Sequence, residues 1–161
     1  MKIDSYKEEF KMVEWDFAES PVNEEQIQQV ETKLGIKFPK DYKECVMQNG
    51  GGTPTPEVFD AGERKDAVFG YLYSFHEDSD SFIINAYNRY RDGRMADRLI
   101  PIADDAFGNE ICFDFRASET NPPVVFWDHE EAFENPEAAV TYVCDNFTEL
   151  INSLREYEEE E

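Results

Sequence analysis

The stretch LIPIADDAFGNEICFDF, residues 99–115, decides the fold of this 161-residue chain. Two runs of apolar and β-branched residues flank a polar centre, which is the pattern of two strands joined by a turn. The dipeptide Gly108-Asn109 suits the positive φ angles that a tight hairpin turn requires. We therefore expect an antiparallel hairpin. Its first strand should lie at a sheet edge, because Pro101 has no N–H group to donate to a neighbouring strand.

More strands are expected on both sides of this hairpin. The segment VVFWD, residues 124–128, follows Asn121-Pro122-Pro123 and is an apolar run of strand length. An aromatic face without interleaved basic residues is typical of a core covered by helices and not of a nucleotide-stacking platform. The segment AVFGYLYSF, residues 67–75, predicts such a strand, with these residues on one face: Phe69, Tyr71, Tyr73 and Phe75.

Helices are expected before these strands. Asn23, with Gln26 three residues later, forms a capping box at the start of one helix, and Gly35 closes it. The next helix has Pro39 at its first position and ends at Asn49-Gly50-Gly51-Gly52. Because this glycine run follows a helix and lacks a GK[ST] ending, we interpret it as a helix stop and not as a phosphate-binding loop. An earlier helix is predicted from an apolar stripe at helical spacing: Ile3, Tyr6, Phe10, Val13 and Phe17.

Two further helices are expected downstream. One begins near Ser79 or Ser81 and ends at Gly93. The acidic residues 156–161 are expected to form a frayed tail. The last helix begins at Asn135-Pro136 and carries a long apolar stripe: Val140, Val143, Phe147, Leu150, Ile151 and Leu154.

The order of these elements predicts the fold class. Helices come first, strands with one inserted helix follow, and a helix ends the chain. Segregated elements of this kind predict an α+β fold with an antiparallel sheet, flanked by N-terminal helices and one long C-terminal helix. Without an internal repeat or a long linker, residues 1–161 are expected to form a single domain.

Charge is the most unusual property of the chain. It has 15 Lys and Arg residues against 37 Asp and Glu, which gives a net charge of −22. Phosphate backbones and anionic membranes would be repelled, because binding them takes several Lys or Arg contacts. The composition therefore argues against nucleic-acid and membrane binding and favours a basic protein partner. A soluble protein with an acidic surface and no such partner would have the same composition.

Cysteines and chain ends give further expectations. Cys45, Cys112 and Cys144 are odd in number and widely spaced, and no CxxC occurs, so neither a disulfide framework nor a zinc site is indicated. The start MKIDSYKEEF lacks the apolar core of a signal peptide, and no segment approaches the length of a membrane span. We expect a cytoplasmic protein with no cofactor and no bound metal.

The two histidines are the first candidates for catalytic or metal-binding residues. His76 and His129 each follow a predicted strand and lie beside carboxylates, which suit an acid–base pair or a metal site. Neither has HxH, HxxH or HExxH spacing, and in so acidic a chain a carboxylate lies near almost any position. No GxSxG motif and no Cys or Ser with a local base is present. We expect no enzyme, and a metal-dependent hydrolase that uses both histidines is the less favoured hypothesis.

Binding is the alternative to catalysis. Acidic residues gather at the ends of the predicted strands, and a Trp next to them is typical of a binding hot spot. A core Trp beside a solvated acidic face is the competing interpretation. The Asp pair after the first hairpin strand is equally compatible with ordinary turn chemistry. The residues that we predict to bind a partner are these: Asp104, Asp105, Trp127, Asp128, Glu130 and Glu131.

Three stretches together resemble the SUKH superfamily. The segment at residues 22–52 is similar to the family pattern lP..y..f....nGg, through Phe38-Pro39, Tyr42, Val46, Asn49 and Gly50. The hairpin is similar to ipia.d..Gn.i..d, through Ile100 to Ala103, Asp105, Gly108-Asn109 and Asp114. VVFWDHEEAF, residues 124–133, resembles v.fwdHe. The resemblance covers residues of about 22 to 155.

The resemblance implies an α+β fold and a role without catalysis. Bacterial members of this superfamily are immunity proteins that neutralise toxins, many of them nucleases, and fungal relatives are regulators of cell-wall assembly. The favoured hypothesis is an immunity protein that binds a cognate toxin domain through an acidic surface. The alternative hypothesis is a regulatory or scaffold module that has no toxin target.

Overall fold

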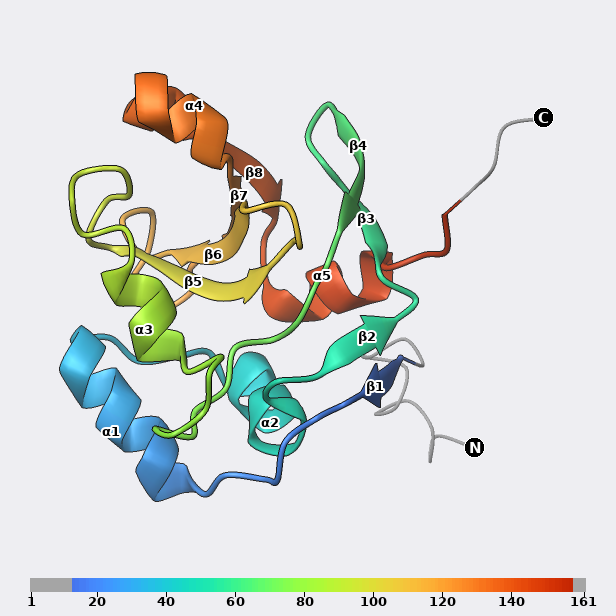
Figure 1. The fold of residues 1–161 in the computed structure, drawn as a ribbon, viewed down its shortest axis with the longest axis vertical. Helices are drawn as coiled ribbons and strands as arrows, with labels where there is room; N and C mark the ends of the chain where they lie inside the picture. The colour runs from blue at the N-terminus through green and yellow to red at the C-terminus, as the bar shows by residue number, and fades with distance from the viewer. Residues whose placement is uncertain (1–12, 158–161) are drawn as a thin grey trace.

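A four-stranded antiparallel sheet lies at the centre of the protein, which we describe from a computed structural model for residues 13–157 (Figure 1). The predicted hairpin is confirmed, and its first strand lies at the sheet edge as Pro101 indicated. Pro101 pairs with Cys112, and the register shifts by one residue between Pro101 and Ala103. In spatial order the strands are β5 (Leu99–Asp104), β6 (Glu110–Asp114), β7 (Val124–Trp127) and β8 (Val140–Cys144).

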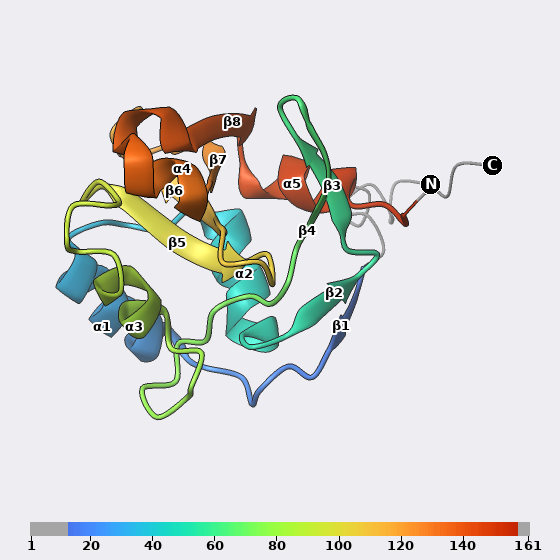
Figure 2. The same cartoon turned by 45° about the horizontal axis from the view of Figure 1, so that its top comes forward.

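Two small antiparallel strand pairs and five short helices surround this sheet within the described part of the chain (Figures 1 and 2). The class is α+β, as predicted. Strand β1 (Glu14–Asp16) pairs with β2 (Thr53–Thr55), from which α1 and α2 separate it in the chain, and β3 (Val58–Ala61) forms a hairpin with β4 (Arg64–Val68). The helices are α1 (Glu24–Leu34), α2 (Lys40–Asn49), α3 (Ile83–Asn88), α4 (His129–Glu134) and α5 (Phe147–Ser153), and a 3₁₀ turn, η2, spans Pro136–Ala139.

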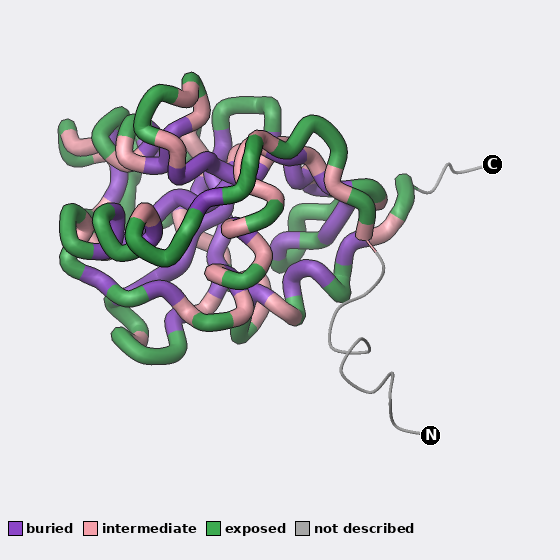
Figure 3. The backbone as a smooth tube through the Cα atoms, turned by 90° about the horizontal axis from the view of Figure 1, so that it is seen from below, coloured by how far each residue is buried: buried purple, intermediate pink, exposed green. Residues whose placement is uncertain are grey.

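Both faces of the central sheet are buried. On one face, Ile111, Phe113 and Phe126 join a core that includes residues of α1, α2 and α5. On the other face, Cys112 and Trp127 join a smaller core that includes Ala132 of α4 and Ala139 of η2. Figure 3 shows the buried segments running through the interior, with the exposed loops outside them. Because both faces are covered, the strands are apolar almost throughout and do not alternate clearly in sequence.

The capping signals of the first two helices are confirmed. The amide of Gln26 donates to Asn23 Oδ1 at 2.9 Å, and the amide of Asn23 donates to Gln26 Oε1 at 3.1 Å, which completes the capping box. Gly35 ends α1 with φ of 70° and donates its N–H to the carbonyl of Glu31 at 2.8 Å. Pro39 is the N-cap of α2, one position before its predicted place. The glycine run ends α2 as predicted.

Two predictions from apolar spacing were wrong. Glu14–Asp16 forms strand β1 instead of the end of a helix, because it pairs with β2; the earlier positions Ile3, Tyr6 and Phe10 lie outside the described residues. The segment after β4 is not a regular strand: it makes the isolated bridges Leu72–Ala103 and Ser74–Phe82. Burial on both sides of this segment, and not alternation, explains its aromatic content.

The prediction of one long C-terminal helix is also wrong, although the predicted fold class is confirmed. Residues Val140–Cys144 form β8, which pairs with β7 through Val140–Trp127 and Tyr142–Val125. The helical stripe misled here because Val140 and Val143 also suit a strand, and long-range pairing with β7 decides between the two. The helix begins only at Phe147, where Asn146 Oδ1 accepts the amide of Glu149 at 2.8 Å. The helix predicted from Ser79 or Ser81 to Gly93 is also shorter in the structure, where α3 spans only Ile83–Asn88.

Candidate partner-binding site

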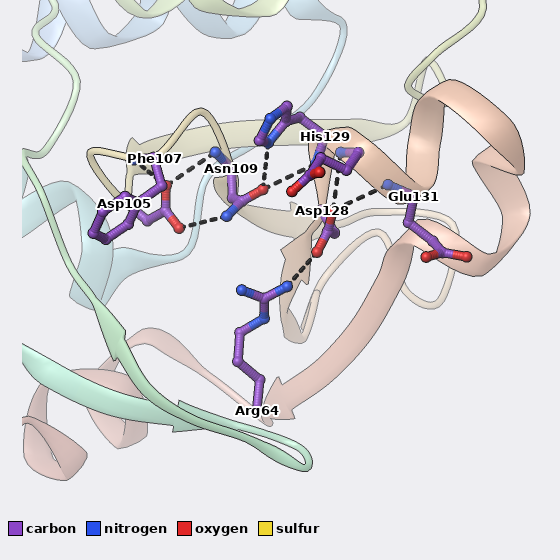
Figure 4. Close-up of polar contacts among 8 residues, drawn as sticks. Arg64, Asp105, Phe107, Asn109, Asp128, His129 and Glu131 are labelled. Atoms are coloured by element: carbon purple, nitrogen blue, oxygen red, sulfur yellow. Dashed lines mark hydrogen bonds and ion pairs between the residues drawn. The ribbon is translucent and has the colours of Figure 1, made fainter.

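The loop between β5 and β6 is built around the carboxylate of Asp105. Asp105 Oδ1 accepts the amides of Phe107 at 2.8 Å and of Asn109 at 2.9 Å, and Oδ2 accepts Asn109 Nδ2 at 2.7 Å (Figure 4). Only 2% of Asp105 is exposed, so these three N–H donors compensate a buried charge. The turn is therefore a rigid five-residue loop, longer than the two-residue turn that Gly108-Asn109 suggested.

Asn109 connects this loop to helix α4. Because its Nδ2 donates to Asp105, its Oδ1 is free to accept, and it accepts the backbone N–H of His129 at 3.0 Å. The same oxygen lies 2.8 Å from His129 Nδ1, so Nδ1 carries the proton and donates it. No described residue hydrogen-bonds to Nε2. His129 is thus oriented by Asn109, with its other ring nitrogen available.

Asp128 begins α4 and fixes a third chain segment. Its Oδ1 accepts the amides of Glu130 at 2.9 Å and Glu131 at 3.0 Å, so Asp128 is the N-cap of α4. Its Oδ2 pairs with Arg64 of the β3–β4 hairpin. The Arg64 guanidinium also lies 4.8 Å from the centre of the Phe126 ring. Figure 4 shows these contacts joining the hairpin, the β5–β6 loop and α4.

Gly108 allows the loop and the helix to lie this close. Its φ is 94°, in the left-handed region, and a Cβ atom there would lie 3.2 Å from His129 Nδ1. A side chain at this position would therefore be strained and would press on the histidine ring. The family-like pattern of Asp105, Gly108-Asn109 and Asp128-His129 thus forms one internal scaffold.

The structure separates the six predicted contact residues into two groups. Trp127 is fully buried, with its ring 4.5 Å from that of Tyr90 and its Nε1 donating to the carbonyl of Arg94 at 3.2 Å. Because it faces the smaller core, the interpretation of Trp127 as a surface anchor is wrong. Asp105 is likewise internal. Glu130 and Glu131 are exposed, and Asp128 is partly exposed.

Asp104 belongs to the sheet edge more than to the surface. Its Oδ1 accepts the amide of Tyr71 at 3.0 Å, and burial raises the pKa of its carboxyl group. Gly70 makes this approach possible, since a Cβ atom there would lie 2.1 Å from Asp104 Oδ1. Asp104 therefore attaches the irregular segment after β4 to the edge strand β5.

Two exposed aromatic residues were missed by the sequence analysis. Phe107 at the tip of the β5–β6 loop is 69% exposed, and Phe133 on α4 is 82% exposed. Single exposed apolar side chains are ordinary on protein surfaces, whereas a group of them in one region marks a candidate interaction site. The signal was present for Phe107, which lies in a turn between Asp105 and Gly108, where no strand or helix can direct it into a core.

Glu110 lies beneath the loop and is almost fully buried. It accepts hydrogen bonds from the hydroxyl of Tyr73 at 2.6 Å and of Tyr90 at 3.0 Å, and Arg89 lies 4.0 Å away. Burial raises the pKa of the Glu110 carboxyl to about 8, and the two tyrosine hydrogen bonds and Arg89 only partly oppose this effect. The Glu110 carboxyl group, directly after Asn109, is therefore protonated and neutral at acidic pH.

The two histidines do not form one site. His76 is held by the carbonyl of Ser20, 2.7 Å from its Nε2, and lies near Gln26, whereas His129 is held by Asn109. Within residues 13–157, no group of three or more His, Cys, Asp or Glu side chains has the arrangement of a metal site. The three cysteines are free. No described helix combines the length and apolar character needed to cross a membrane.

Comparisons with known proteins agree with the resemblance. The model of the SMI1 / KNR4 family (SUKH-1) matches residues 21–153. The chain is also similar to the SPbeta prophage-derived uncharacterized protein YokK of Bacillus subtilis (strain 168). The two are 30% identical over 149 residues, which cover 81% of this chain and 73% of that relative.

Removing the Asn109 side chain should destabilise the protein more than an ordinary surface change. In Asn109→Ala, Asp105 loses one donor and the His129 amide loses its acceptor, so we expect the free energy of unfolding to fall by about 3 kcal/mol. Urea denaturation followed by tryptophan fluorescence measures this. The control is Asn121→Ala in an exposed loop, with an expected loss of about 0.5 kcal/mol or less. Equal losses in the two variants would show that the network is not needed.

Glu110 should make stability depend on pH. The unfolded chain releases this proton near the usual value of 4.5, whereas the folded protein keeps it up to about 8, so the free energy of unfolding falls as pH rises between these values. Glu110→Gln removes this contribution. Relative to wild type, the variant should gain about 5 kcal/mol between the two limits. The exposed Glu137→Gln serves as control, and a parallel pH profile for Glu110→Gln would contradict the assignment.

Proposed function

This chain belongs to the SMI1 / KNR4 family (SUKH-1), and on that premise we propose that it is an immunity protein that binds a toxin domain and blocks it. It would act in the cytoplasm and by binding alone, with no bond made or broken. The observation that carries the proposal is a rigid, acidic surface at α4 and the adjoining loop. Family membership indicates a toxin domain as the partner, and the acidic surface indicates how this chain would bind it.

The acidic surface is preorganised. Glu130, Glu131 and Glu134 are exposed on a helix that Asp128 caps and that Asn109 ties to the sheet. Because these contacts already fix the backbone, little conformational entropy would be lost when a partner binds. The nearby cation, Arg64, is engaged by Asp128 and does not face the three glutamates as a counter-ion.

The charge of the chain supports a basic partner. A net charge of −22 creates a field that attracts cationic surfaces over distances of about 10 Å at moderate salt. If the toxin is a nuclease, its substrate groove must be basic in order to hold phosphates, and exposed glutamates can occupy such a groove in their place. Electrostatic steering of this kind raises association rates toward roughly 10⁸ M⁻¹s⁻¹ at low salt.

The proposal gives the histidines structural roles. His76 and His129 are occupied by hydrogen bonds that hold loops together. The Ser20 hydroxyl lies 3.1 Å from His76 Nε2, but the same nitrogen donates to the Ser20 carbonyl at 2.7 Å and so cannot serve as a base for that hydroxyl. A metal-dependent hydrolase would require the two rings to converge, whereas they contact different parts of the chain. Binding therefore accounts for the site better than a reaction does.

Co-expression with the product of the adjacent upstream gene tests the function directly. We expect that product to arrest growth on its own, that this chain restores growth, and that the two proteins purify as a complex. The control is the same pair in which this chain carries Asn109→Ala, which disturbs the scaffold of the surface. A neighbouring gene product that is harmless, or that does not bind, would favour the regulatory-module alternative.

Association should depend on salt and on the glutamates of α4. In Glu130→Gln/Glu131→Gln we expect the association rate at low salt to fall on the order of threefold, because steering charge is lost at the contact. Glu77→Gln/Asp78→Asn removes the same charge from another exposed loop and should have a smaller effect. Stopped-flow binding measures both rates. Equal rates for the two variants would place the contact elsewhere, and a rate independent of salt would remove electrostatic steering.

A further inference from the structure

We propose that Phe107 and Phe133, on the two elements that meet at His129, form with Glu130 and Glu134 a contact surface for arginine or lysine side chains of the partner. This inference rests on the proposed function, since it names the part of the surface that holds the toxin and the chemistry that it recognises. It assigns roles to two residues that the scaffold of the site leaves unused.

The two phenylalanines are placed by the scaffold and not by a core. The amide of Phe107 donates to Asp105 Oδ1 at 2.8 Å, so the loop backbone is fixed while the ring projects outward, 69% exposed. Phe133 is 82% exposed on α4, next in sequence to the buried Ala132. Rigid, exposed aromatic side chains are the usual anchors of protein interfaces, because ordering them costs little entropy.

His129 lies where the two elements that carry these rings meet. Its own ring is 3.2 Å from the position of a Cβ atom on Gly108, the residue that follows Phe107 in the loop. It precedes Phe133 by four residues on α4, a spacing that places two side chains on one face of a helix, about 6 Å apart. Figure 4 shows Asn109 holding His129 beside the loop that carries Phe107.

Carboxylates adjoin the aromatic residues on the same helix. Glu130 precedes Phe133 by three residues and Glu134 by four, so the Glu130 carboxylate lies next to the Phe133 ring and next to the Glu134 carboxylate. A ring face attracts a cation, and an adjacent carboxylate pairs with it. The same combination already occurs beside the site, where Arg64 lies over Phe126 and pairs with Asp128.

Charge selects the occupant. The described part of α4 carries no Lys or Arg, and three of its six residues are exposed glutamates. A second copy of this chain would bring another net charge of −22 to the same surface and would be repelled. An uncharged apolar partner would leave the glutamates unpaired on binding. A partner that presents arginine or lysine satisfies both the rings and the carboxylates.

A peptide titration tests the chemistry without any toxin. We would titrate the ¹⁵N-labelled full chain with acetyl-Gly-Arg-Gly-Arg-Gly-amide and follow amide signals by NMR, with the Gln-for-Arg peptide as control. The expected shifts lie at residues 106–108 and 129–134, and Phe107→Ala/Phe133→Ala should weaken binding on the order of fivefold. Phe17→Ala removes an 88% exposed ring at the end of β1, on the other side of the molecule, and should leave binding unchanged (Figures 1 and 2).

A leucine variant separates the aromatic contribution from apolar area. Phe107→Leu/Phe133→Leu keeps the apolar surface and removes the ring faces. It should therefore weaken binding of the arginine peptide nearly as much as Phe107→Ala/Phe133→Ala does. Full binding by the leucine variant would overturn the cation–ring contact. Shifts spread over all acidic loops, unchanged by either variant, would overturn the whole inference.

Binding of the toxin distinguishes this inference from the proposed function. If the wild-type chain captures the neighbouring gene product, Phe107→Ala/Phe133→Ala should weaken that complex at least tenfold, while Phe17→Ala should not. A complex of unchanged affinity would overturn the contact surface and leave the immunity function standing. Peptide binding at this surface without any toxin complex would support the contact surface and overturn the immunity function.

Discussion

The buried carboxylate of Asp105 is the group on which the candidate site depends. A carboxylate that is 2% exposed must be compensated by donors, and here the loop supplies three of them. Two are backbone amides, so compensation fixes the path of the chain. The third is the Asn109 side chain, and its commitment to Asp105 leaves its oxygen for His129. One charge therefore determines the loop, the start of α4 and the orientation of a histidine ring.

The acidic residues of the chain divide into two kinds with different consequences. Asp105 and Asp128 are paired with amides or with Arg64, and they act as structural acceptors. Glu110 is buried under two tyrosines and is held neutral over much of the pH range. Glu130 and Glu131 remain exposed on α4 and contribute to the external field. A net charge of −22 therefore overstates the uniformity of the surface, because only exposed carboxylates such as those of Glu130 and Glu131 are available to a partner.

Elements that depend on neighbouring residues could be predicted from the sequence, whereas elements that depend on distant contacts could not. The capping box at Asn23 and the strands around Gly108 could be predicted, because caps and turns depend on residues a few positions apart. The strand β8 was taken for helix because its pairing with β7 is a long-range contact that spacing does not reveal. Trp127 was misplaced because it was judged by the acidic residues that follow it, although the continuous apolar run Val124–Trp127 is typical of a strand buried on both faces. Its burial follows from α4 and η2 folding over that side.

The burial of both sheet faces also explains where a binding surface can arise. Every strand residue of β6 and β7 is buried, whereas the edge strand β8 is partly exposed, so the two central strands present no face to a partner. Contacts must come from the loops and helix ends around it, and these normally lack fixed conformations. In this protein, Asp105, Asn109 and Asp128 supply the missing rigidity from within, and they are among the residues that resemble the family pattern. Phe107 lies inside that pattern without being part of it. A scaffold of residues that match the family pattern and hold Phe107 at a fixed position is what the proposed binding function requires.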